Sequence, residues 1–130
     1  MLFRSGNIKR AIDSVTASSV INPTDPGIFF QLGLLKYNIQ DFDGAISALE
    51  KATTMTPDYA NAKYFLGLSY EVTGEHQKAI EQFLGLKVTN PDSKEVDLIL
   101  SNLIAGKPIF TNAPSTKPEK AKSLPVKENL

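Results

Sequence analysis

The strongest constraint on this chain of 130 residues is an internal repeat with a period of 34 residues. Pairs of residues recur at that spacing: Leu32-Gly33 and Leu66-Gly67, Ala45-Ile46 and Ala79-Ile80, Pro57-Asp58 and Pro91-Asp92. One period earlier stand Ala11-Ile12 and Pro23. Periods of this length are typical of arrays in which each repeat is one small unit that buries its apolar face against the next.

Each full unit reads as two helices joined by a short turn. Residues 26–39 and 60–73 carry apolar residues at spacings of three and four, and so do residues 42–55 and 76–89. The turns at 40–41 and 74–75 are tight, which predicts antiparallel hairpins. Small residues stand where helix backbones must approach closely, at Gly33, Ala45, Gly67 and Ala79.

A partial unit precedes the two full units. Gly6-Asn7 reads as a turn, and residues 8–20 read as a second helix with an apolar face of Ile8, Ala11, Ile12 and Val15. This helix lacks a hairpin partner, and exposing each large aliphatic side chain costs about 1.5–3 kcal/mol. We therefore expect that the natural protein continues N-terminally or that this free edge pairs with another molecule.

Residues 92–105 read as a capping helix that covers the last repeat, with Asp92 or Ser93 as its N-cap and Gly106 then Pro108 as its stop. Residues 107–130 hold four of the eight prolines and no glycine, and their five Lys and two Glu give a net charge of +3. This composition predicts disorder. The simplest interpretation is a solubilising tail. Ile109-Phe110 is the candidate anchor for a short motif, which could also fold back onto the repeats.

The repeated residues resemble the tetratricopeptide repeat, whose signature is a leading aromatic, Leu-Gly, Tyr, Ala, Phe and Pro over 34 residues. The matching positions are Phe29, Leu32-Gly33, Ala45, Leu49, Ala52 and Pro57, then Leu66-Gly67, Tyr70, Ala79, Phe83 and Pro91. The departures are Lys63 for the leading aromatic, Lys36 for the Tyr, Leu86 for the second Ala, and Gln40 in a turn that suits Gly.

The resemblance covers about residues 1–93 and implies an all-α solenoid of antiparallel helix hairpins, a tetratricopeptide superhelix. It divides the chain into a partial repeat over residues 1–25, full repeats over 26–59 and 60–93, a capping helix over 92–106 and a disordered tail over 107–130.

Composition excludes several classes of function. Fourteen Lys and Arg balance fourteen Asp and Glu, and the basic residues of the repeats are scattered, so no nucleic-acid partner is expected. The chain has no cysteine and one histidine, His76, which reads as a solvated surface residue. No apolar run approaches the roughly 20 residues that span a bilayer, so direct membrane insertion is not expected. The compartment cannot be read from the sequence, and the cytoplasm is the default.

The carboxylates that cluster in the sequence have a structural explanation. Asp41 and Asp43, and Asp92, Glu95 and Asp97, stand at predicted helix starts, where they cap exposed N–H groups. No glycine-rich phosphate loop accompanies them. We therefore expect no enzyme, no catalytic residue, no metal site and no cofactor.

The first helix of each hairpin carries a second stripe of side chains beside the one that packs on its partner helix. The stripe consists of Phe30, Leu34, Tyr37 and Asn38, and of Asn61, Tyr64, Leu68 and Glu71. The resemblance implies that these eight residues line a concave groove for a peptide. The Lys, Asn and Arg clamp with which some family members hold acidic chaperone termini is missing. The plainer alternative is that neighbouring repeats cover the stripe.

The sequence thus predicts a protein-interaction scaffold that binds a peptide or protein segment in a mainly aromatic and aliphatic groove. Aromatic burial would supply free energy, and Asn side chains would hold the bound backbone. One alternative is a structural repeat module that self-associates through residues 8–20. The other is a docking domain of a larger bacterial protein, membrane-attached or not.

Overall fold

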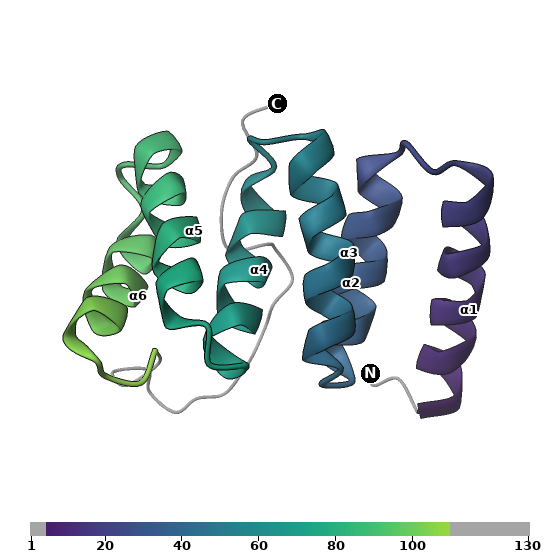
Figure 1. The fold of residues 1–130 in the computed structure, drawn as a ribbon, viewed down its shortest axis with the longest axis horizontal. Coiled ribbons are helices and arrows are strands. Elements are labelled where there is room, and N and C mark those ends of the chain that lie inside the picture. Colours follow the sequence, from purple (N-terminus) through teal and green to yellow (C-terminus); the bar gives the residue numbers. More distant parts are fainter. Residues whose placement is uncertain (1–4, 110–130) are drawn as a thin grey trace.

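The computed structural model describes residues 5–109, and these residues form six α-helices and no strand. The helices are α1 (Ser5–Ile21), α2 (Pro26–Asn38), α3 (Phe42–Met55), α4 (Ala60–Val72), α5 (His76–Thr89) and α6 (Lys94–Ala105). They follow one another along the long axis of the molecule, with α1 at one end and α5 and α6 at the other (Figure 1). The all-α hairpin array expected from the repeat is confirmed.

The hairpins α2–α3 and α4–α5 close through the glycines that the repeat conserves between its two copies. A Cβ atom on Gly33 would lie 2.5 Å from Cγ of Leu49, and one on Gly67 would overlap the ring of Phe83. Leu49 and Phe83 are fully buried and stand one period apart. A larger residue at either glycine would force the two helices apart.

Short polar side chains and left-handed residues set the ends of the helices. Asp41 caps α3 by accepting a hydrogen bond from the Gly44 amide at 3.0 Å, and Ser93 caps α6 by accepting one from the Val96 amide at 3.2 Å. Gly74 and Gly106 take positive φ angles of 90° and 74°, which glycine adopts without a Cβ clash. Of the two expected N-caps of α6, Ser93 is the one used.

One expectation about the N-terminal unit was wrong. Gly6-Asn7 is not a turn, because α1 begins at Ser5 and includes both residues. Near a helix start glycine costs little, and nothing lies within 4 Å of a Cβ built on Gly6. Helix α6 begins at Lys94, directly after its expected N-cap Ser93, which takes an extended conformation. Of the expected disordered tail, residues 110–130 lie outside the described residues.

One continuous core runs through α2 to α6. Its largest fully buried side chains include Leu49, Leu66, Phe83, Leu86 and Ile99. Helix α1 packs only on α2 among the described helices, and none of its residues 6–21 is buried. In the described part of the chain, no helix is long and apolar enough to cross a membrane.

Candidate functional site

The eight stripe residues lie on α2 and α4, the first helices of the two hairpins, and we call the surface they share the inner face. The structure leaves them with different exposure. Phe30, Asn61, Tyr64 and Leu68 are buried, Leu34, Tyr37 and Glu71 are half-buried, and Asn38 is exposed. Phe30, Tyr64 and Leu68 belong to the hydrophobic core and Asn61 is a buried polar residue beside them, so the accessible part of the stripe is smaller than its sequence pattern suggests.

A row of edge-packed aromatic rings joins the first helices. The ring of Tyr37 lies 5.4 Å from that of Phe42 and 5.3 Å from that of Phe65, so it bridges α2 and α4. Phe65 in turn lies 5.2 Å from Tyr64, whose ring is 5.6 Å from Phe83 of α5. Tilted and edge-on ring pairs are favourable beyond the area they bury. The row therefore holds the inner face in a fixed shape across the repeats.

Tyr64 uses its hydroxyl to tie α4 to α6. The hydroxyl donates a hydrogen bond to the Glu95 carboxylate at 2.5 Å, and the tyrosine is 4% exposed. Burial, and then the bonded and negatively charged Glu95, raise the pKa of Tyr64 well above its ordinary value. The phenol therefore stays neutral and keeps donating. Tyr64 therefore has a structural role, because its hydrogen bond links α4 to α6. The acceptor is Glu95, which the sequence analysis expected only to cap the start of a helix.

The Tyr37 hydroxyl is a polar group without a partner in the described part of the chain. Burial raises the pKa of this phenol. The ring is half-buried and fixed between two other rings. A rigid aromatic ring with an unpaired hydroxyl suits recognition, because little conformational entropy is lost when a partner packs on it.

At the other end of the stripe, Glu71 pairs with the only histidine. The Nδ1 atom of His76 lies 3.0 Å from a carboxylate oxygen of Glu71, and both side chains remain partly exposed. The expectation that His76 is simply solvated was therefore incomplete. The pair joins the last turn of α4 to the first turn of α5 across Gly74.

The inner face continues onto α6, which the sequence analysis treated only as a cap. Adding one period of 34 to Asn61, Tyr64 and Leu68 gives Glu95, Leu98 and Asn102. Two of these residues make side-chain hydrogen bonds. Glu95 accepts the Tyr64 bond, and the Asn102 amide donates to the carbonyl oxygen of Ile109 at 2.9 Å. Simple addition of the period would have found all three.

Within the described residues, no group of three or more His, Cys, Asp or Glu side chains could hold a metal ion. Two further acidic residues at the helix starts also have structural roles. Asp97 of α6 pairs with Lys87 at 2.6 Å, and Asp41 caps α3.

The described helices form a helical-hairpin array, the arrangement of a protein-interaction module. The tetratricopeptide repeat family model matches residues 30–94, half of the chain, and the chain belongs to this family. Members of the family are in general non-enzymatic interaction scaffolds. No curated protein sequence matches the chain.

Solved structures support the same assignment. The crystal structure of MamA shares 31% sequence identity with a TM-score of 0.73, over 78% of this chain and 59% of that one. The first tetratricopeptide domain of Spaghetti (RPAP3), bound to an HSP90 peptide, has a TM-score of 0.73 at 18% identity, over 78% of this chain and 80% of that one. The translocator chaperone SycD of Yersinia enterocolitica has a TM-score of 0.69 at 20% identity, over 78% and 75%. The last two show the fold alone, and this chain spans about three fifths of the MamA chain.

Proposed function

We propose that the repeats bind an extended or helical segment of a protein partner along the inner face, with the accessible part of the stripe as the contact surface. That part consists of Leu34, Tyr37, Asn38 and Glu71, together with Leu98 on α6. The observation that carries the proposal is the Tyr37 ring, which is held rigid by two neighbouring rings while its hydroxyl has no partner among residues 5–109.

The structure also contains an example of the chemistry proposed for the bound backbone. The Asn102 side chain donates to the main-chain carbonyl of Ile109, a residue outside any helix. Asn38 is exposed on α2 and carries the same amide group. A partner with apolar side chains would pack on Tyr37 and Leu34, while amide groups of the face hold its carbonyls.

The partner predicted here is mainly apolar, with basic rather than acidic character. Leu34 and Tyr37 supply aliphatic and aromatic surface, whereas the charged residues of the face are Glu71 and Glu95. An acidic chaperone terminus of the kind bound by the RPAP3 domain would meet carboxylates here. We expect such a peptide to bind poorly.

The test is a selection of ten-residue peptides displayed on phage, followed by anisotropy titrations with the selected peptides. Replacing Tyr37 by Ala should weaken binding by about 1–3 kcal/mol, or roughly 5- to 150-fold. Tyr37→Phe keeps the rings in place and should lose about 0.5–1.5 kcal/mol, the usual contribution of one hydrogen bond. The matched control is Met55→Ala on the outer side of α3, which should leave affinity unchanged. Equal affinities for all four proteins would place binding elsewhere.

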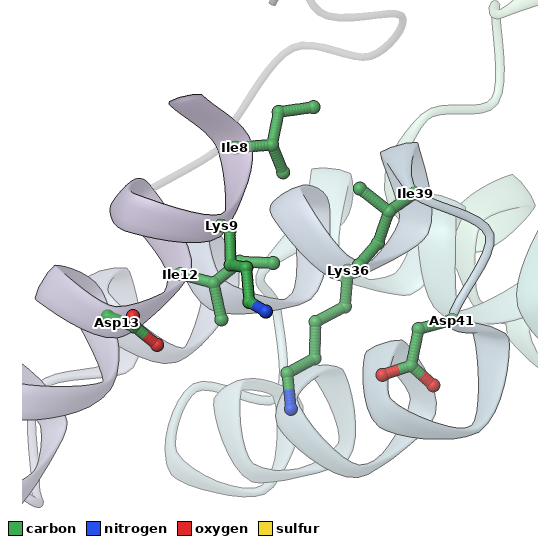
Figure 2. A pocket seen from close by; sticks show the side chains of 7 residues that line it. All are labelled: Ile8, Lys9, Ile12, Asp13, Lys36, Ile39 and Asp41. Atoms are coloured by element: carbon green, nitrogen blue, oxygen red, sulfur yellow. The ribbon is translucent and has the colours of Figure 1, made fainter. Parts of the chain in front are cut away.

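Self-association through α1 is a second candidate function, and a pocket between α1 and α2 favours it. The pocket has a volume of about 530 Å³, and its lining combines the aliphatic side chains of Ile8, Ile12 and Ile39 with four charged side chains (Figure 2). Lys9 and Asp13 of α1 lie beside it. Ile39 is 45% exposed, so apolar surface at this edge of the array is open to a partner.

Helix α1 can pair with α1 of a second copy of the chain because its charged residues are self-complementary. In an antiparallel pair related by a two-fold axis at Ala11, Lys9 of each copy faces Asp13 of the other. Asp13→Lys should therefore prevent association, and the double variant Lys9→Asp, Asp13→Lys should restore it. Sedimentation velocity over a range of concentrations measures this. A concentration-independent monomer for the unmodified chain excludes this function and leaves binding at the inner face unaffected.

A further inference from the structure

The chain turns back onto the inner face after α6. Gly106 ends the helix in the left-handed conformation, and the Lys107 amide donates to the Asn102 carbonyl at 2.8 Å. Three residues beyond that turn, the Ile109 carbonyl accepts the hydrogen bond of the Asn102 side chain, and Ile109 packs against the core. Asn102 stands one period after Leu68 and two after Leu34, so Ile109 is fixed at an inner-face position.

Helix α4 is buried on the same face. Its closest helix neighbours are α3 and α5, and α6 reaches it through the Glu95 side chain. Even so, Asn61 is 1% exposed and Leu68 is 4% exposed, and both lie on the inner face. A helix at the surface of a repeat array ordinarily keeps one stripe open to solvent. Leu68 belongs to the hydrophobic core, but Asn61 is a polar residue outside that core, so its burial is what a covered face shows.

We propose that the segment that follows Ile109, residues 110–130, docks along the inner face of its own molecule and occupies the partner site. This inference rests on the proposed function of that face, whose regulation it supplies. Phe110 is the first residue of the segment and its most hydrophobic anchor. The partner must displace the segment to bind.

The segment is long enough for this path. Packed helices lie about 8–10 Å apart, so the distance from α6 across α4 to α2 is on the order of 20 Å. An extended chain covers about 3.3 Å per residue, so six or seven of the 21 residues after Ile109 would cross the face.

Charge favours the same path. Residues 107–130 carry five Lys and two Glu, a net charge of +3, and the rest of the chain carries −3. Glu71 and Glu95 lie on the inner face itself. The segment is also tethered next to the face, at an effective concentration in the millimolar range. Even weak docking, with a dissociation constant near 0.1 mM, would then lower the apparent affinity of a partner about tenfold.

The experiment places a nitroxide label on the segment and measures relaxation of backbone amides in the full chain by NMR. The protein has no cysteine, so Lys120→Cys gives a single labelling site. We expect at least a twofold loss of signal for the amides of Leu34, Leu68 and Asn102. The matched reference amides are those of Ser47 and Thr54, exposed residues of α3 outside the inner face, which should keep full intensity.

Two further samples decide how the segment docks. The first sample mixes chains that carry the nitroxide but no ¹⁵N with ¹⁵N-enriched chains that carry no nitroxide, so it detects docking between molecules. We expect no signal loss in that sample. Asn102→Ala removes the amide that holds Ile109 and should at least halve the relaxation effect, with its helix content checked by circular dichroism. Ile109→Ala removes the adjacent anchor and should act in the same direction.

Each outcome has a consequence. Uniform or absent signal loss in the singly labelled chain would overturn the docking proposal, and so would a loss seen only between molecules. Because the readout uses no foreign ligand, this failure is separate from that of the proposed function. If docking is observed but no selected peptide binds a chain that ends at residue 109, the proposed function fails while the docking stands.

Discussion

Two glycines inside helices give opposite predictions for the same substitution. At Gly67, a Cβ atom would overlap the ring of Phe83, a fully buried side chain with no room to move. Overpacking of this kind costs about 1–3 kcal/mol, and the better helix propensity of alanine returns about 0.5–1 kcal/mol. We therefore expect Gly67→Ala to lower the free energy of unfolding by about 1–2 kcal/mol.

Gly85 is the matched control because it lies inside α5 with open space around it. The one atom near a Cβ built there is Nζ of Lys63 at 3.5 Å, the flexible end of a long side chain. Gly85→Ala should therefore raise the free energy of unfolding by about 0.5–1 kcal/mol. The two variants should move Tm in opposite directions, by several degrees each.

The assay is urea unfolding followed by far-UV circular dichroism, with both variants and the unmodified chain measured together. The slope of the transition should not change, since neither substitution alters the surface exposed on unfolding. If Gly67→Ala stabilises the protein as much as Gly85→Ala does, then α4 and α5 are not in close contact at Gly67. That result would refute the explanation that the repeated Leu-Gly pairs mark a close approach of the two helices in each hairpin.

Further predictions concern turns, hydroxyls and caps. Gln40 has a φ of 66°, so Gln40→Gly should stabilise the protein by about 0.5–1 kcal/mol, whereas Gly74→Gln should destabilise it by a similar amount in the same urea assay. Because the pKa of Tyr64 is raised in the folded protein, the unfolded chain loses the phenol proton first as pH rises. The free energy of unfolding should therefore fall above about pH 10. It should fall less steeply in Tyr64→Phe. Ser93→Ala should cost about 1 kcal/mol in unfolding experiments, unless water caps α6 equally well.

The fold could be predicted because the residue types that the hairpins require occur in both full copies of the repeat. Gly33 and Gly67 mark the close approach of two helices, and Leu49 and Phe83 mark the side chains that fill it. The helix at residues 5–21 was predicted with the wrong start, because its single partial copy gave no second example against which to read Gly6-Asn7.

The candidate site was less predictable because position in a stripe does not fix exposure. Tyr37 of α2 and Tyr64 of α4 both belong to the predicted stripe, yet the Tyr64 hydroxyl bonds to Glu95 while the Tyr37 hydroxyl is unpaired among the described residues. The difference lies in the next helix along the array. Predicting it requires knowing that α6 continues the repeat and brings a carboxylate opposite Tyr64.

Equivalent positions of the repeat have different roles along the array, and this difference indicates which residues determine the specificity for a partner. Leu34, Leu68 and Asn102 stand one period apart. Leu68 is buried, Asn102 holds a backbone carbonyl of its own chain, and Leu34 is left half-buried beside Tyr37. Two of the three positions are thus committed to the molecule's own structure. Contacts that distinguish one partner from another should therefore concentrate on α2, where Leu34, Tyr37 and Asn38 still have surface to offer.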